Sequence, residues 1–249
     1  MSEYGYSSAE DMEKVFKYLK NVDADGTLPY QKEYENLYID NGFSFAVPDK
    51  NEKVWYLTFD DGPNTEVTPK VLDTLKEYGA KATFFVIYRD GEEEKALYKR
   101  IVEESHTLGI HSTTHNYTQI YASVESYLEN FSKISNHLEE ITGLKPEIFR
   151  FPGGSVNSYN KSVYQQIIAE MARRGYVYYD WNYSSGDASD PGVSRADPIH
   201  RKKYFSATTA PGTKTRRSLC PKSSRACLGR ATPSRRWTTQ YLRSASAID

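Results

Sequence analysis

The sequence predicts an α/β fold built on parallel strands. Segments with strand-like and helix-like patterns alternate about five times between residues 54 and 181, which is typical of parallel strands joined by helical crossovers. Residues 82–88 form an unbroken apolar run, as expected for a strand that is buried on both faces. Acidic or histidine side chains follow several of the expected strands, and α/β folds place their chemistry at the carboxyl ends of strands.

Each element of this alternation has its own local pattern. A strand over 54–59 is rich in β-branched and aromatic residues and stops at Gly62-Pro63. The longest helical stripe runs from Val124 to Ile141, with apolar side chains three or four residues apart. The elements expected in chain order are helix 8–20, strand 54–59, helix 71–78, strand 82–88, helix 92–108, a short strand at 109–111, helix 124–141, strand 147–151, helix 163–174 and strand 176–181.

Length and composition limit the number of domains and the class of protein. A chain of 249 residues is long enough for one large domain or two small ones. Mean hydropathy is −0.70 and no apolar run is long enough to span a bilayer, so we expect no membrane span. The first 50 residues contain no apolar segment of the signal-peptide type, so we expect no export signal in this sequence. The 21 tyrosines suit sugar rings, because Tyr has a flat apolar face and a polar tip, but Tyr is also common on ordinary surfaces.

The last segment, residues 195–249, differs from the rest. It holds 13 Lys and Arg against two Asp and no Glu, and no helix or strand period fits it. Its two cysteines, Cys220 and Cys227, are too few for a disulfide framework and make a poor metal site on their own. We therefore predict an N-terminal helix and connector over 1–50, a catalytic domain over 51–194, and a basic tail over 195–249 that is disordered or translated out of frame. The alternative is an in-frame tail that binds nucleic acid or an anionic wall polymer.

Two pairs of residues have the types and spacing of a metal site. Asp60 and Asp61 end the first strand, where successive side chains point in opposite directions and can serve different tasks. His111 and His115 are four residues apart, so on a helical turn they share one face and can bind one metal ion. Either Asp could complete a two-histidine, one-carboxylate set. The alternatives are an Asx-rich turn that caps the next helix and a solvated helix face.

Two later strand ends also carry polar residues. Arg150 could hold a carboxylate bidentately and keep it ionised, and the glycine pair that begins at Gly153 frees backbone N–H groups to approach an oxyanion. Trp181 could form an apolar floor for a methyl group, and Asp187 could accept a hydrogen bond from a histidine. The alternatives are a plain glycine turn with a surface Arg, a packed Trp and a turn Asp.

The order of these segments resembles the polysaccharide deacetylase family, that is, the NodB-type deacetylase domain of carbohydrate esterase family four. The resemblance covers roughly residues 50–190 and four of the five family motifs. The matching segments are Thr-Phe-Asp-Asp-Gly-Pro at 58–63, His-Ser-Thr-Thr-His at 111–115, Arg-Phe-Pro-Gly-Gly-Ser at 150–155 and the residues from Asp180 to Asp187. The Gly-Gly form is most similar to bacterial peptidoglycan N-acetylglucosamine deacetylases. The implied fold is a distorted (β/α) barrel, here incomplete because its C-terminal strands and helices are not recognisable.

The resemblance implies metal-dependent hydrolysis of the N-acetyl groups of amino-sugar polymers, with peptidoglycan or a chitin-like oligosaccharide as substrate and zinc as the divalent metal. It also implies an extracellular or cell-wall location, and we expect a monomer that does not bind nucleic acid. The implied roles are general base for Asp60, metal ligands for Asp61, His111 and His115, orientation of the base for Arg150, oxyanion binding by the backbone N–H at Gly153, substrate contact for Trp181, and tuning of the general acid for Asp187.

The fifth family motif, a late apolar strand that ends in a proton-donating His, is missing. Residues 212–222 contain no His, and the only late imidazole, His200, follows no strand-like segment. We therefore expect greatly reduced deacetylation, and a non-catalytic glycan-binding pseudoenzyme is the alternative reading. If the tail is out of frame, another reading frame of the gene past codon 195 should encode an apolar strand ending in His.

Overall fold

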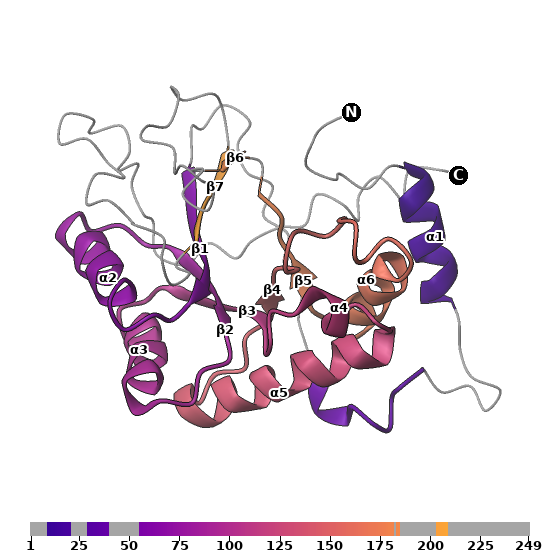
Figure 1. Cartoon of the computed structure of the whole chain (residues 1–249), viewed down its shortest axis with the longest axis horizontal. Helices are drawn as coiled ribbons and strands as arrows, with labels where there is room; N and C mark the ends of the chain where they lie inside the picture. Colours follow the sequence, from indigo (N-terminus) through magenta and orange to yellow (C-terminus); the bar gives the residue numbers. More distant parts are fainter. Residues whose placement is uncertain (1–8, 21–28, 40–54, 182, 185–202, 209–249) are drawn as a thin grey trace.

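A computed structural model describes residues 9–20, 29–39, 55–181, 183–184 and 203–208 (Figure 1). The helices are α1 (Ala9–Leu19), η1 (Glu35–Leu37), α2 (Thr68–Glu77), α3 (Glu92–Glu103), α4 (Tyr117–Ile120), α5 (Val124–Thr142) and α6 (Tyr164–Arg173). The strands are β1 (Trp55–Gly62), β2 (Thr83–Ile87), β3 (Thr107–Ser112), β4 (Ile148–Phe149), β5 (Val177–Tyr178), β6 (Tyr183–Ser184) and β7 (Lys203–Thr208). The predicted alternation of strands and helices is confirmed.

The seven strands form one parallel sheet in the order β5-β4-β3-β2-β1-β7-β6. If this sheet were flat, β5 and β6 would lie about 29 Å apart, at about 4.8 Å per strand. Yet β6 follows β5 closely in the chain, and the five steps from Tyr178 to Tyr183 span at most about 18 Å. The sheet must therefore curve round so that its two ends approach each other, as in a barrel. The barrel-like α/β fold that we predicted is confirmed.

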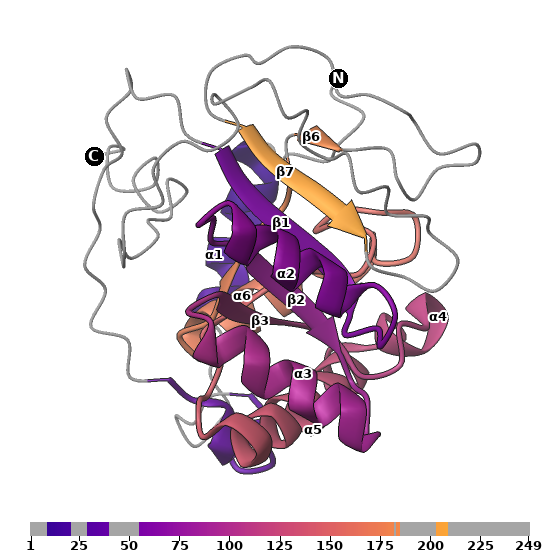
Figure 2. The same cartoon turned by 90° about the vertical axis from the view of Figure 1, so that its left-hand side faces the viewer.

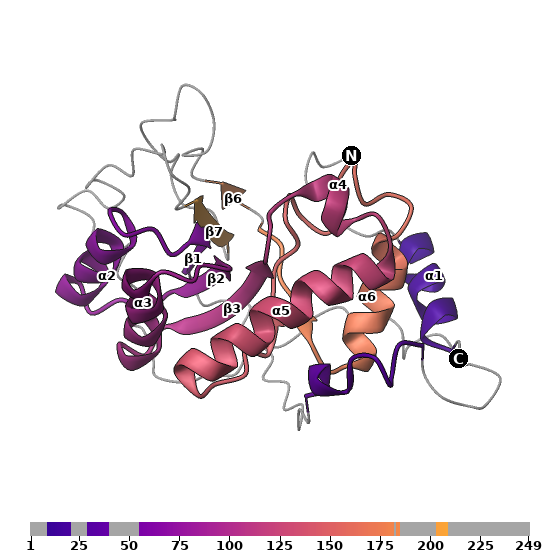
Figure 3. The same ribbon diagram turned by 60° about the horizontal axis from the view of Figure 1, so that its bottom comes forward.

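The helices cover the outside of this curved sheet. Figure 2 shows α2 and α3 over the face formed by β1 and β2, with β7 alongside β1. Figure 3 shows α5 crossing below β3, and α6 lying between α5 and α1. Helix α5 has a complete set of end signals: the Ser123 side chain accepts a hydrogen bond from Ser126 N, and Gly143 ends the helix at a φ of 67°.

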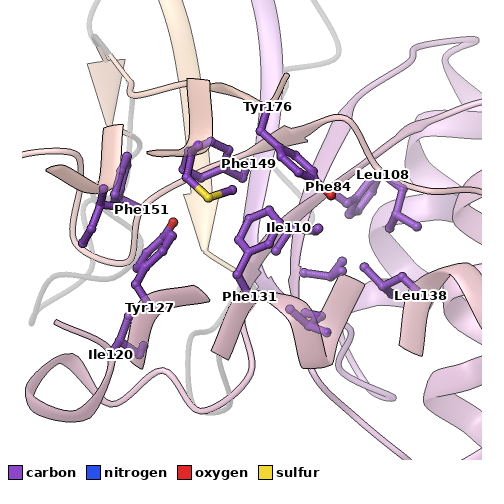
Figure 4. Close-up of a cluster of buried hydrophobic side chains, with 14 of the residues drawn as sticks. Phe84, Leu108, Ile110, Ile120, Tyr127, Phe131, Leu138, Phe149, Phe151 and Tyr176 are labelled. Carbon is purple, nitrogen blue, oxygen red and sulfur yellow. The ribbon is translucent and has the colours of Figure 1, made fainter. Parts of the chain in front are cut away.

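Aromatic side chains dominate the core between α5 and the sheet (Figure 4). Phe131 of α5 lies edge-on to Phe149 of β4 at 5.5 Å and to Tyr176 at 4.8 Å between ring centroids. On the β1 side, Phe59 stacks on Phe84 at 5.1 Å. Full burial of each such side chain stabilises the fold by about 1.5–3 kcal/mol. This packing holds the carboxyl ends of β1, β3 and β4 in fixed relative positions.

A buried ion cluster joins the N-terminal segment to α6. Arg174 donates to Glu170 Oε1 at 2.9 Å and to the carbonyl oxygens of Tyr34 and Tyr30 at 2.7 and 3.0 Å. Arg173 also contacts Glu170 and donates to the carbonyl of Tyr18 at 2.8 Å. Residues 9–20 and 29–39 are thus packed against the same unit as the sheet.

Three sequence expectations are corrected. The helix predicted over 92–108 ends at Glu103, because Ser105 adopts a left-handed φ of 59° and Thr107 N donates to the carbonyl of Ala82, which starts β3. The expectation that no strand follows residue 195 is wrong for β7, which pairs with β1 over its whole length. The short strand expected at 109–111 is longer and spans β3.

Within the described part of the chain, no helix is long and apolar enough to cross a membrane. Cys220, Cys227, His200 and Asp187 lie outside the described residues. The three-segment division of the chain stays a prediction.

Candidate active site

The end of β1 presents both adjacent carboxylates. Asp61 has a φ of 66°, which is uncommon for a residue with a Cβ atom, and the pairing of β1 with β2 shifts between Asp60 and Gly62. This irregularity interrupts the regular alternation of strand side chains. Asp60 contacts Arg150, whereas Asp61 faces two imidazoles. The two carboxylates therefore have different partners, but a local bulge places them rather than simple strand alternation.

The two histidines converge, although not on a helical turn. His111 lies in β3 and His115 follows it in a loop, with a left-handed φ of 50°. Ser112 Oγ accepts a hydrogen bond from His115 N at 3.0 Å, which closes the loop. The predicted helical turn is wrong, because β3 continues through Ser112 and the chain then turns back. The two rings end 5.3 Å apart, so one ion can reach both.

Asp61, His111 and His115 have the geometry of a metal-binding set. Their ligand atoms all lie within 4.8 Å of one another. Asp61 Oδ1 is 3.3 Å from His111 Nε2 and 3.1 Å from His115 Nε2, and this buried oxygen accepts no well-formed hydrogen bond. A buried, unsatisfied carboxylate oxygen between two imidazole nitrogens is what a cation at this position would explain. The donor set therefore fits a divalent metal ion.

A second contact orients His111. Its Nδ1 lies 2.8 Å from the carbonyl oxygen of Arg150, and His111 is 4% exposed. With Nδ1–H donated to that carbonyl, Nε2 presents its lone pair to Asp61. Outer contacts of this kind fix the tautomer of metal-binding histidines.

The local electrostatics also favour a cation. Burial alone would raise the pKa of Asp61, but the adjacent imidazoles of His111 and His115 hold it well below its usual range. Burial alone would lower the pKa of His111, yet the neighbouring carboxylates of Asp61 and Asp60 raise it. Carboxylates and imidazoles thus shift each other toward their charged forms. Two carboxylates at a mostly buried site attract positive charge, whether a proton or a metal supplies it.

Arg150 holds the other carboxylate. It is fully buried, and its Nη1 donates to Asp60 Oδ1 and to Thr58 Oγ1, both at 2.8 Å. Its Nε donates to the carbonyl of Tyr179, and the guanidinium lies 4.3 Å from the centre of the Phe85 ring. The contact with Asp60 is a single hydrogen bond, not the bidentate pair that we expected, because the other donors are used on other groups. Asp60 is thereby fixed beside the Asp61 set.

The glycine pair forms a bare loop beside these groups. Gly153 and Gly154 have φ values of 75° and 87°, which favour glycine, and Gly153 is exposed. Gly154 N donates to the carbonyl of Phe151, whereas Gly153 N has no acceptor among the described residues. A methyl group on Gly154 would touch the Trp181 ring at 3.6 Å. The loop therefore leaves the Gly153 N–H without an acceptor among the described residues.

The model of the family described as polysaccharide deacetylase matches residues 48–175. The match spans just over half of the chain and contains Asp60, the three candidate ligands and Arg150. This chain belongs to the polysaccharide deacetylase family. Its curved parallel sheet is accordingly the barrel-like fold of that family.

Several relatives of this deacetylase-family chain are bacterial proteins. YheN of Bacillus subtilis (strain 168), named as a polysaccharide deacetylase, is 40% identical over 136 residues, 55% of this chain and 46% of YheN. A peptidoglycan-N-acetylglucosamine deacetylase of Bacillus cereus is 37% identical over 138 residues, 55% of this chain and 48% of that protein. The match thus spans about half the length of these two relatives.

Among solved structures, the deacetylase-family chain is similar to the catalytic domain of peptidoglycan N-acetylglucosamine deacetylase from Eubacterium rectale ATCC 33656. The identity is 31% and the TM-score 0.58, over 67% of this chain and 80% of that one.

Some residues near the site were not expected from the sequence. Asp180 accepts hydrogen bonds from Ser155 N at 2.9 Å and from Ser155 Oγ, which ties the glycine loop to the segment after β5. Burial raises the pKa of Asp180. Tyr117 lies over Gly153, where an added methyl group would meet its hydroxyl at 3.2 Å. The position of Tyr117 two residues after His115 was the only sequence signal for its place at the site.

Proposed function

We propose that this member of the polysaccharide deacetylase family removes acetyl groups from N-acetylated amino sugars of a polymer by metal-dependent hydrolysis. The observation that carries the proposal is that the ligand atoms of Asp61, His111 and His115 all lie within 4.8 Å of one another. Arg150 holds Asp60 beside these three residues. The names of the relatives support peptidoglycan as the substrate, with chitin-like oligosaccharides as a chemically similar test substrate.

Asp61, His111 and His115 would hold the metal, with zinc preferred for a two-histidine, one-carboxylate set. Such a cation supplies Lewis acidity toward the acetyl carbonyl and toward the attacking water.

The chain's own residues perform the remaining tasks. Asp60 accepts the proton of the attacking water as general base, and the buried guanidinium of Arg150 keeps its carboxylate in position. The Gly153 N–H points to a role in binding the oxyanion as the carbonyl carbon becomes tetrahedral. Trp181 supports the glycine loop and offers an apolar surface for the acetyl methyl group.

Protonation of the leaving amine is the step with the weakest support from the described residues. His106 Nδ1 accepts from Ala82 N at 3.3 Å, and His137 Nε2 lies 2.7 Å from the Arg89 carbonyl. His111 and His115 are the proposed metal ligands, so no described imidazole remains to act as the acid. Asp60 would have to return the proton that it accepted. We therefore propose an activity well below that of a relative with a late histidine.

We further propose action at the bacterial cell wall by a monomeric protein. The support for the location is the substrate named for the relatives, and size-exclusion chromatography with light scattering tests the oligomeric state.

The metal dependence is tested with two isosteric variants of neighbouring residues. The chelator-treated protein should release little acetate from peptidoglycan or chitooligosaccharide, and added zinc should restore release. D61N should lose both bound metal and activity, because it removes a ligand. D60N should keep its metal but lose about 10²–10⁴-fold in activity, because it removes the base. Metal content by mass spectrometry separates the two results.

Acetate release that is unaffected by the chelator, or normal zinc binding by D61N, would contradict the proposal. If the wild type binds zinc and glycan but releases no acetate, the pseudoenzyme alternative replaces hydrolysis.

A further inference from the structure

We propose that Tyr117 and Tyr159 form an aromatic sugar-binding wall beside the metal-binding set, which holds the pyranose ring next to the one that carries the reacting acetyl group. The inference rests on the proposed function for the identity of the ligand, an N-acetylated amino-sugar oligomer. It assigns a role to two side chains that the hydrolysis described above does not use.

The wall begins at a proposed metal ligand. The Tyr117 ring lies 5.3 Å from the His115 ring, and the Tyr159 ring lies edge-on to Tyr117, also at 5.3 Å. Tyr159 is 54% exposed, whereas most large apolar and aromatic side chains of the described chain are buried or half-buried. The aromatic surface thus runs without interruption from the catalytic centre to solvent.

The loop that carries Tyr159 is tied to the glycine loop. Asn157 Oδ1 accepts hydrogen bonds from the backbone N–H of Tyr159 at 2.9 Å and of Asn160 at 3.1 Å. Asn157 Nδ2 donates to the carbonyls of Pro152 and Gly154, both at 3.2 Å. These bonds position Tyr159 relative to Gly153 before any ligand binds, so little ordering is needed on binding.

Gly153 lies directly against the inner end of this wall. Gly153 is exposed, and the Tyr117 hydroxyl lies 3.2 Å from where a Cβ atom at Gly153 would be. The Tyr117 hydroxyl, next to an aromatic face, offers hydrogen bonding together with apolar surface.

A sugar is the ligand that matches this chemistry. A pyranose ring has an apolar face of C–H groups surrounded by hydroxyl and amide groups, and the flat face and polar tip of Tyr suit both parts. The wall adjoins the point where an acetamido group would react, so it faces the neighbouring unit of the same chain. A single exposed Tyr is ordinary on a protein surface. Here, however, two Tyr rings in contact extend outward from the His115 ring.

The test compares Y159A with Y159F and with L144A. Leu144 is the other exposed large apolar residue of the described chain, at 51%, and it follows the end of α5 away from the site. Binding of the β-1,4-linked tetramer of N-acetylglucosamine is measured by calorimetry on the full, chelator-treated chain, so that no turnover occurs. Y159A should weaken binding about five- to tenfold, while Y159F and L144A should stay within about twofold.

Kinetics on the zinc-loaded chain give a second readout. Y159A should raise KM for the tetramer and leave kcat unchanged, and its rate on a small aryl acetate should equal that of the wild type. Comparing Y117F with Y117A in the same assays separates the effect of the Tyr117 hydroxyl from the effect of its ring.

Three results would each refute the proposed sugar-binding wall: unchanged tetramer binding by Y159A, an equal loss of binding in L144A, or no tetramer binding by the wild type. If binding depends on Tyr159 but no acetate is released, hydrolysis fails and the wall stands. If acetate is released with a KM that is insensitive to Tyr159, the wall fails and hydrolysis stands.

Discussion

His106 and His111 are both buried, yet their surroundings shift their pKa values in opposite directions. His111 faces the carboxylates of Asp61 and Asp60, which raise its pKa against the effect of burial. At His106, burial and the nearby Lys81 together lower the pKa to about 4, and Glu104 offsets this only in part. The His106 ring accepts a hydrogen bond from Ala82 N and packs against Phe84. His106 therefore has a structural role as a neutral ring.

This difference predicts a pH dependence of stability. The folded-state pKa of His106 is about 4, below its usual value of 6.5, so an unfolded chain takes up the proton first as the pH falls. The stability that the neutral His106 ring gives the folded protein is therefore fully present above pH 6.5. As the pH falls from 6.5 to 4, the free energy of unfolding should decrease by up to about 2–3 kcal/mol because of this group. H106N keeps an acceptor for Ala82 N but does not titrate.

The measurement is urea unfolding of wild type and H106N at pH 7.5 and at pH 4.5. The wild type should lose more stability than H106N over this range. Equal losses in the two proteins would show that His106 does not titrate differently on folding.

At the scale of elements, α6 links the N-terminal segment to the barrel. Glu170 is 1% exposed and contacts both Arg173 and Arg174, and other N–H groups of these two arginines donate to the backbone carbonyls of residues 18, 30 and 34. Arg174 also lies 4.8 Å from the centre of the Tyr38 ring. A buried ion pair contributes little net stability when it is complete, but the loss of one partner leaves an uncompensated charge.

E170Q should therefore destabilise the protein by about 3–5 kcal/mol. The matched control is E92Q, which removes an exposed carboxylate from the surface pair with Lys95 and should change stability by at most about 1 kcal/mol. Thermal unfolding gives both values. Limited proteolysis should also release the N-terminal segment faster from E170Q. Similar melting temperatures for E170Q and E92Q would rule out the proposed anchoring role.

At the scale of the whole molecule, curvature of the sheet creates the site. Arg150 follows β4 and Asp60 lies in β1, and two strands separate β4 from β1 in the sheet order. Their side chains nevertheless meet at 2.8 Å, because the sheet curves. The same curvature brings the end of β3, with His111, next to the end of β1. Any acid for the leaving amine would have to reach this enclosed point from another part of the chain.

Because the described residues offer no further imidazole at the site, ester cleavage should be impaired less than amide cleavage. An aryl oxide leaves without protonation, whereas the amine of an N-acetyl sugar needs a proton. The zinc-loaded chain should therefore cleave an aryl acetate at a rate close to that of a family member with a late histidine, and an N-acetylated oligosaccharide at least about 10²-fold more slowly than that relative. Parallel assays of both substrates on both proteins measure this. A similar ratio of the two rates in both proteins would show that another group supplies the proton.

Local pattern in the sequence was enough to predict the alternating α/β architecture and the residue types at each strand end. Apolar periodicity, the Gly62-Pro63 stop and the buried run at 82–88 depend on neighbours in the chain, so they can be recognised before folding. The length of α3 was not predictable in this way, since a left-handed Ser105 and pairing of β3 with β2 end it.

Only the tertiary structure decided how the candidate residues meet. His115 lies next to His111 because the chain turns after β3, not because the two share a helix. The N–H groups of Arg150 donate to several acceptors and not to Asp60 alone. The contact between Tyr117 and Tyr159 and the pairing of β7 with β1 join segments that are distant in the chain. The physical reason is that such contacts depend on how a sheet curves, and curvature is a property of all its strands together.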